Sequence, residues 1–163
     1  MNIQEYQKLY QEFTSRIAAS AQHLESTITQ SEKDLIMPLA EKARKIYDLG
    51  TGNGRIPKFL SEQGIEASIC GIESNWQMFL QASEFQTLQM RFFYSDILDW
   101  LKTADEADLI LCVGNTIGGL IDEKYRDFVF ISVYEKLQKG GYFVMDYRPI
   151  DAVLKNDFVA SRR

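Results

Sequence analysis

A glycine-rich turn constrains this chain most, because it lies directly between a short apolar run and an amphipathic segment. The run Ile-Tyr-Asp-Leu at 46–49 predicts a strand, and glycines follow it at alternate positions, Gly50, Gly52 and Gly54. Residues without a Cβ atom let the backbone turn sharply and come within van der Waals distance of a ligand. Pro57 then suits the first turn of a helix, where its missing N–H is not needed. The pattern predicts a strand–loop–helix unit that holds a small molecule, with a ligand-free tight turn as the alternative.

The spacing of these glycines separates two classes of nucleotide site. A dinucleotide fingerprint, Gly-x-Gly-x-x-Gly, would need glycine at Arg55 or at Pro57, and neither position has one. A phosphate loop would need Gly-Lys-Ser or Gly-Lys-Thr, which the sequence lacks. A nucleotide-binding or NAD-binding Rossmann protein is therefore the least favoured interpretation of the turn.

Beyond the turn, the apolar pattern alternates regularly between strands and helices. The expected strands cover 46–49, 68–72, 91–94, 109–113 and 142–145, and the expected helices lie near 57–63, 77–83, 97–102 and 123–137. Helices interleaved in this way imply parallel strands with right-handed crossovers, so the sequence predicts an α/β fold with a doubly wound, mainly parallel sheet. Ligands of such sheets lie beyond the carboxyl ends of the strands.

The chain is expected to form one domain. Residues 1–44 should form helices packed on the core, and residues 45–163 should form the ligand-binding part. Apolar residues at three- and four-residue steps within 3–17 predict a first helix, which either covers the sheet edge or forms a lid over the ligand. Ser31, with acidic residues in the turn that follows, predicts the cap of a second helix.

Composition excludes several functional classes. A content of 45% hydrophobic and 25% charged residues is ordinary for a globular domain, and a net charge of −5 argues against a nucleic-acid-binding surface over the whole domain. No apolar run approaches the roughly 20 residues that span a membrane, and the N-terminus lacks a signal-peptide pattern, so we expect a cytoplasmic protein. His23 is the only histidine, and Cys70 and Cys112 lie in apolar runs, so we expect no metal site and no Ser-His-Asp triad.

Two acidic residues follow later strands. Glu73 ends the second strand, and its two carboxylate oxygens could accept hydrogen bonds from both hydroxyls of a ribose. A strand-end glutamate is most often a solvated residue, but its place after the glycine turn favours the ligand role. Asp96 follows the third strand, where it could simply cap the helix that begins at Ile97.

The stretch Asp-Leu-Gly-Thr-Gly-Asn-Gly at 48–54 resembles the first motif of class I S-adenosylmethionine-dependent methyltransferases, an acid followed by Gly-x-Gly-x-Gly. The resemblance implies S-adenosylmethionine as the cofactor, with its methionine part along Gly50–Gly52 and its amino group held by Asp48. It also implies that Asp96 accepts the adenine amino group. The residues that it places around the cofactor are Asp48, Gly50, Thr51, Gly52, Gly54, Glu73, Ser74, Met78, Asp96, Ile97, Gly114 and Asn115.

Two further stretches, 113–120 and 145–151, resemble the glycine and sarcosine N-methyltransferase subgroup. There a Gly-Asn-Ser-type turn follows the fourth strand and Asp-x-Arg-x-x-Asp follows the fifth, whereas this chain has Gly119 in place of the usual histidine. The resemblance implies a small-molecule acceptor, such as an amine or amino acid nitrogen. We expect no catalytic nucleophile, because the cofactor already carries an activated methyl group. The candidate orienting residues are Asn115, Thr116, Tyr147 and Arg148.

The acceptor side of the pattern allows more than one interpretation. Gly118 and Gly119 either leave room for a second molecule or form only a loop. The superfamily normally continues through a further helix and two antiparallel strands, whereas the resemblance here covers roughly 46–151. Without those strands, the strand at 142–145 would present an edge that must be covered or paired. We expect a truncated chain, with a homodimer or a decayed enzyme as alternatives, so a catalytically incomplete cofactor-binding module competes with an active methyltransferase.

Overall fold

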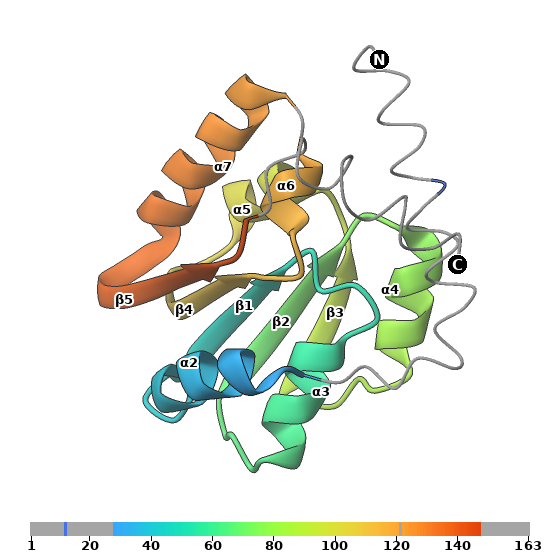
Figure 1. The fold of residues 1–163 in the computed structure, drawn as a ribbon, viewed down its shortest axis with the longest axis vertical. Coiled ribbons are helices and arrows are strands. Elements are labelled where there is room, and N and C mark those ends of the chain that lie inside the picture. The colour runs from blue at the N-terminus through green and yellow to red at the C-terminus, as the bar shows by residue number, and fades with distance from the viewer. Residues whose placement is uncertain (1–11, 13–27, 121, 148–163) are drawn as a thin grey trace, which may run out of the picture.

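A computed structural model describes residues 12, 28–120 and 122–147, which form a single sheet flanked by helices (Figure 1). The predicted first helix and Arg148 lie outside the described residues. The strands are β1 (Lys45–Leu49), β2 (Ser68–Glu73), β3 (Met90–Tyr94), β4 (Ala107–Cys112) and β5 (Leu137–Met145). The helices are α2 (Gln30–Ala40), α3 (Arg55–Glu62), α4 (Trp76–Ser83), α5 (Ile97–Thr103), α6 (Thr116–Gly119) and α7 (Glu123–Lys136).

The sheet has the strand order β3-β2-β1-β4-β5, and every pairing is parallel. This confirms the predicted α/β doubly wound fold. The chain reverses its direction of winding between β1 and β4, so the carboxyl ends of these two strands meet at the switch point where ligands of such sheets bind. The turn after β1 and the loop after β4 therefore lie next to each other.

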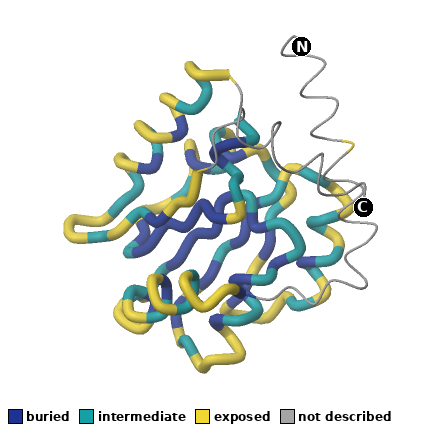
Figure 2. Tube along the Cα trace, in the orientation of Figure 1, coloured by how far each residue is buried: buried dark blue, intermediate teal, exposed yellow. Residues whose placement is uncertain are grey.

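Alternating side chains of the central strands divide the core into two layers. Ile46 of β1 packs with α2, α3 and α4, whereas Tyr47 and Leu49 pack with α5, α6 and α7. In β4 the same alternation sends Leu109 to the first cluster and Ile110 to the second. Figure 2 shows the resulting band of buried residues along the middle of the sheet. Because helices cover both faces, the central strands consist of almost uninterrupted apolar residues.

The structure corrects two local predictions. The cap of α2 is Thr29 rather than Ser31: the Thr29 hydroxyl accepts a hydrogen bond from the Glu32 N–H at 3.2 Å, and the Glu32 carboxylate accepts one from the Thr29 N–H at 2.8 Å. This is the reciprocal capping box of a Thr-x-x-Glu sequence. The second difference is that β5 begins at Leu137, earlier than the predicted strand at 142–145. The residues after β4 form the short helix α6.

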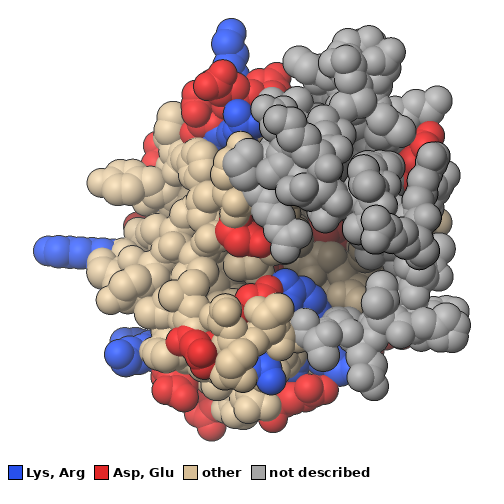
Figure 3. Space-filling view, viewed as in Figure 1, with Lys and Arg blue, Asp and Glu red and all other residues tan. Residues whose placement is uncertain are grey.

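The outer strand β5 and helix α7 carry several exposed apolar side chains. Within the described ranges β5 pairs with β4 on one side, and Tyr142 keeps 57% of its surface exposed. On α7, Phe128, Ile131 and Tyr134 are exposed by 54–81%. The flank over these two elements is mostly uncharged in Figure 3, where acidic and basic side chains are otherwise interspersed over the visible coloured surface.

The described residues include both cysteines, and their helices can be compared with the length that a membrane span requires. Cys112 is buried, Cys70 is half-buried, and both thiols are free. None of the described helices combines the length and the apolar character that crossing a membrane requires.

The two-sided core predicts a large difference between two leucine substitutions. Leu101 of α5 is fully buried, whereas Leu88, in the segment between α4 and β3, is fully exposed. Leu101→Ala should lower the free energy of unfolding by about 2–5 kcal/mol, because it removes packed methyl groups and leaves a cavity. Leu88→Ala should change it by less than about 0.5 kcal/mol. Urea denaturation of both variants measures the difference, and equal effects would contradict the described packing.

Candidate functional site

The turn after β1 is built on a left-handed backbone. Gly50, Gly52 and Gly54 have φ angles of 71°, 60° and 80°, which residues with a Cβ atom adopt only at a cost. The N–H groups of Gly50 and Thr51 donate hydrogen bonds to the Ile72 carbonyl of β2 at 2.8 and 3.0 Å. The turn is thereby fastened to the end of the neighbouring strand.

The three glycines differ in what lies next to them. A Cβ atom on Gly50 would lie 2.4 Å from the Thr116 side chain, and one on Gly54 would lie 3.0 Å from the Phe92 ring. A Cβ atom on Gly52 would meet no atom within 4 Å. Gly50 and Gly54 are therefore required by protein packing, whereas Gly52 borders open space that a ligand could fill.

Glu73 is fixed beside that open space. One of its carboxylate oxygens accepts a hydrogen bond from the Gly52 N–H at 2.9 Å, and the other accepts one from the Asn75 N–H at 2.7 Å. Burial raises the pKa of Glu73, while these backbone hydrogen bonds act in the opposite direction. Each oxygen of a carboxylate has a second lone pair, so the orientation of Glu73 leaves it able to accept further hydrogen bonds from a ligand.

Asp48 is the buried acid of the site. Its side chain is 2% exposed at the end of β1, and it accepts a hydrogen bond from the Thr51 hydroxyl at 2.7 Å. Burial raises the pKa of Asp48 to about 6, although the Thr51 hydrogen bond and the positive charge of Arg55 oppose this shift. Burial therefore makes ionisation of Asp48 less favourable than that of an exposed aspartate.

Arg55 was not singled out in the sequence, although it directly follows the glycine turn. Its guanidinium forms an ion pair with Glu32 of α2, and both side chains are about one-fifth exposed. Burial works against ionisation of Glu32, but the hydrogen bonds from Arg55 and Thr29 lower its pKa to about 2. Glu32 therefore stays ionised at neutral pH.

Asp96 acts as the helix cap that its position after β3 suggested. One oxygen accepts hydrogen bonds from the N–H groups of Leu98 and Asp99 at 2.8 and 3.3 Å. The other accepts a hydrogen bond from the Tyr125 hydroxyl of α7 at 2.6 Å. No sequence pattern indicated Tyr125, because it reaches Asp96 from a separate helix.

The loop after β4 is ordered by hydrogen bonds. Asn115 has a φ of 64°, and its N–H donates to the Asp146 carboxylate, just after β5, at 2.7 Å. The Thr116 hydroxyl donates to the Val113 carbonyl at 3.2 Å. A Cβ atom on Gly118 would lie 2.2 Å from the Asn115 side chain, so the space at Gly118 is filled by Asn115. This corrects the expectation that Gly118 leaves room for a second molecule.

The remaining candidate residues surround this edge with different exposures. Ser74 and Gly114 are exposed, and Met78 of α4 is half-buried. Ile97 is 8% exposed, and Tyr147, after β5, is 50% exposed. The structure thus joins the turn after β1 directly to Glu73 at the end of β2, through the Gly52 N–H. Asp96 is hydrogen-bonded to Tyr125 of α7 and not to this turn. Within the described part of the chain, no group of three or more His, Cys, Asp or Glu side chains could hold a metal ion.

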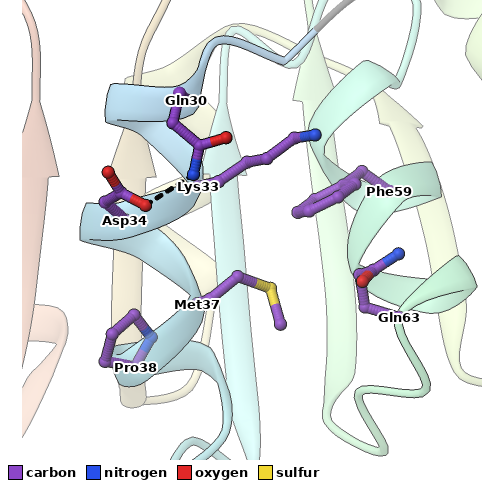
Figure 4. Close-up of a pocket in the computed structure, with 7 residues that line it drawn as sticks. All are labelled: Gln30, Lys33, Asp34, Met37, Pro38, Phe59 and Gln63. Atoms are coloured by element: carbon purple, nitrogen blue, oxygen red, sulfur yellow. Dashed lines mark hydrogen bonds between the residues drawn. The ribbon is translucent and has the colours of Figure 1, made fainter.

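A separate hollow of about 450 Å³ lies between α2 and α3 (Figure 4). Gln30 and Asp34 form a hydrogen bond on its rim, and Lys33 lies 5.4 Å from the centre of the Phe59 ring. No residue of the glycine turn lines this hollow. The candidate site is therefore the edge at the carboxyl ends of the strands and not this hollow.

Comparison with known proteins finds methyltransferases that are similar to this chain in sequence or in fold. Glycine/sarcosine N-methyltransferases of Aphanothece halophytica and Halorhodospira halochloris are 24% and 25% identical over 71% and 81% of the chain. The chain spans only 44% and 51% of the length of these relatives. The crystal structure of the plantazolicin methyltransferase BpumL, in complex with a pentazolic desmethylPZN analogue and SAH, has a TM-score of 0.72 at 17% identity. This alignment covers 97% of the chain and 63% of that protein.

The family model described as "Methyltransferase domain" matches residues 46–141, from the start of the glycine-turn unit into β5. This match covers more than half of the chain and includes both the turn after β1 and the loop after β4. The sheet order, the left-handed glycine turn and the acid at the end of β2 all lie within it. The chain belongs to the methyltransferase domain family.

Proposed function

We propose that this chain binds S-adenosylmethionine at the carboxyl edge of its sheet and takes part in methyl transfer to a small-molecule acceptor. The observation that carries the proposal is the Glu73 carboxylate, held against the Gly52 N–H beside open space. A nucleoside needs such an arrangement, because its ribose offers two hydroxyl donors next to a flat base. The S-adenosylhomocysteine bound in the structure of the plantazolicin methyltransferase supports the same ligand class.

In this proposal each part of the cofactor has its own partners. The ribose hydroxyls donate to Glu73, and the methionine part lies along Gly50–Gly52 with its amino group near Asp48. The adenine lies between Met78 and Ile97, with its amino group directed at Asp96. Asp96 already accepts hydrogen bonds from α5 and Tyr125, so the adenine would use a remaining lone pair.

Methyl transfer requires little of the protein beyond the alignment of the acceptor with the cofactor. S-adenosylmethionine supplies a methyl group on a positively charged sulfur, so attack by an acceptor lone pair forms the new bond while the carbon–sulfur bond breaks. The residues of the chain hold the acceptor in line and exclude water, and no general base is needed for a neutral amine. We assign the orienting role to Asn115, Thr116, Tyr147 and Arg148.

We propose an amine or amino acid nitrogen as the acceptor. The names of the two curated relatives support this class, and so does the ordered turn at Asn115 next to the cofactor edge. An incomplete cofactor-binding module is the second candidate, because the chain spans about half of those relatives. In either case the cofactor half of the site is the same.

The first prediction about the proposed cofactor site concerns the open space at Gly52. Gly52→Val should abolish S-adenosylhomocysteine binding, because the new side chain fills the space that we assign to the ligand. Val is also strained at a positive φ, so Gly64→Val is the matched control: Gly64 has a φ of 78°, likewise with no atom within 4 Å of its Cβ position. Calorimetric titration should show binding by Gly64→Val and none by Gly52→Val. Unchanged binding by Gly52→Val would refute the site.

A second prediction separates the two candidate functions. The chain, incubated with S-adenosylmethionine and either glycine, sarcosine or a simple amine, should form S-adenosylhomocysteine in an acceptor-dependent reaction. Reactions without an acceptor are the control for spontaneous breakdown of the cofactor. Tight cofactor binding with no turnover on any acceptor would favour the incomplete module.

A third prediction follows from the raised pKa of Asp48. The ammonium group of the cofactor prefers ionised Asp48, so below pH 6 binding must first remove a proton. Affinity for S-adenosylhomocysteine should therefore rise as the pH increases through about 6 and then level off. Calorimetry in buffers of different ionisation enthalpy should show proton release near this pH.

Asp48→Asn serves as the control, since it keeps an acceptor for the Thr51 hydroxyl but cannot ionise. It should bind more weakly and with little dependence on pH around 6. Without ligand, the stability that protonated Asp48 provides below pH 3.8 is lost as the pH rises through about 6, and Asp48→Asn should lack this loss. Parallel pH profiles of the two proteins would show that Asp48 does not contact the cofactor.

A further inference from the structure

Helix α7 and the outer strand β5 expose apolar side chains on one flank of the molecule (Figure 1). On α7, Phe128, Ile131 and Tyr134 are three residues apart, so they form one ridge. The ring centres of Phe130 and Phe143 lie 6.2 Å apart and connect this helix to β5. We call the exposed apolar residues of the two elements the β5–α7 flank: Phe128, Phe130, Ile131, Tyr134, Tyr142 and Met145.

The β5–α7 flank is large enough to be an interface. Its members are exposed by 37–81%. The four aromatic residues alone leave roughly 500 Å² uncovered, at about 200 Å² for a complete aromatic side chain. With Ile131, Met145 and the backbone edge of β5 added, the surface approaches the roughly 800 Å² that each partner of a stable complex contributes. Patches of this size on a folded domain mark interaction sites.

The apolar residues of β5 lie on both faces of the sheet. Side chains alternate along a strand, so Tyr142 and Val144 share one face, whereas Phe143 packs in the layer of α7. Within the described ranges β5 is paired with β4 alone, which leaves the outer N–H and C=O groups of Tyr142–Met145 open to another strand. A partner that adds a strand to β5 would cover both faces and this edge together.

The charges on this flank favour a partner of the same kind. The elements α7 and β5 together contain three acidic and four basic residues, a net charge of +1 in a chain of net charge −5. No charged residue lies between Tyr142 and Met145, whereas β3, the other outer strand, carries the exposed Arg91. Two copies can therefore bring their β5–α7 flanks together with little repulsion between like charges, and a strongly charged partner finds no matching charge there.

We infer that the β5–α7 flank is the interface between two copies of this chain, with their β5 strands antiparallel across a two-fold axis. An open strand edge is complementary to itself when it runs antiparallel, and a two-fold axis uses the same surface on both copies. The two sheets become one, and the ridge of α7 packs on its counterpart. This inference does not depend on the proposed function.

The pairing has a consequence for the loop after β4. Asp146 directly follows β5, and its carboxylate accepts the hydrogen bond from the Asn115 N–H. In the pair of copies β5 is hydrogen-bonded on both edges, so this anchor of the loop is held more firmly than in a single copy.

The first test is analytical ultracentrifugation of the full 163-residue chain over a dilution series. The mass should rise from 18.8 kDa towards twice that value as the concentration increases. Ile131→Glu should raise the dissociation constant of the dimer by more than about tenfold, because it places a charge in the apolar ridge. Leu35→Glu is the matched control: Leu35 lies on α2 and is 54% exposed, as Ile131 is, and the variant should dimerise like the wild type.

Hydrogen exchange tests the pairing of the strands. At a concentration at which the wild-type chain is dimeric, amides within Tyr142–Met145 should exchange more slowly in the wild type than in Ile131→Glu. Amides within Met90–Tyr94 of β3, at the opposite edge of the sheet, should exchange equally in both and serve as the internal control. Circular dichroism shows whether each variant is folded, and Tyr134→Glu, at a position 81% exposed, replaces Ile131→Glu if the latter is unfolded.

Three results would overturn the inference. A wild-type chain that stays at 18.8 kDa over the whole series does not use a second copy to cover the flank. A dimer that survives both Ile131→Glu and Tyr134→Glu forms through another surface. Assemblies larger than two copies contradict the two-fold arrangement, because such an interface closes at two. Equal exchange of the β5 amides in dimer and monomer would likewise rule out the added strand.

Discussion

The hydrogen bond from the Gly52 N–H to the Glu73 carboxylate joins the two central strands that build the site. The backbone after β1 takes a positive φ at each of Gly50, Gly52 and Gly54, and this turn brings the Gly52 N–H to the end of β2. The bonds from Gly50 and Thr51 to the Ile72 carbonyl fix the same approach. The orientation of Glu73 and the open space at Gly52 therefore both result from the conformation of the glycine turn after β1.

The same part of the backbone carries two acidic side chains. Asp48 and Glu73 lie at the ends of adjacent strands, and burial raises the pKa of both. Keeping them ionised without a cation costs free energy, because buried charge is poorly solvated. In our proposal, the sulfonium and ammonium groups of the cofactor add positive charge beside these two carboxylates. Arg55 also contributes positive charge but is itself paired with Glu32.

The sequence predicted the parallel sheet because the alternation of apolar runs is a property of local segments. The crossover rules add that the strands are parallel, so acids at their carboxyl ends lie on one edge of the sheet, whereas the order of the strands comes from the structure. The contacts that the sequence did not reveal join separate crossovers: Tyr125 with Asp96 are 29 residues apart, and Arg55 with Glu32 are 23 residues apart. Such pairs follow no regular spacing along the sequence, so only the folded structure shows that they are in contact. The Thr29 capping box, in contrast, was readable from its four-residue spacing.

The two halves of the proposed site, one for the cofactor and one for the acceptor, differ in how they are held. The cofactor half lies on β1 and β2, which are flanked by strands on both sides, and its polar groups are bound to backbone N–H groups. The acceptor half rests on the bond between Asn115 and Asp146, at the outer strand β5, with Tyr147 half exposed. A central strand resists displacement more than an outer one, because it is hydrogen-bonded on both edges. Cofactor binding and acceptor alignment should therefore depend on different parts of the fold, so that damage near β5 impairs transfer before it impairs binding.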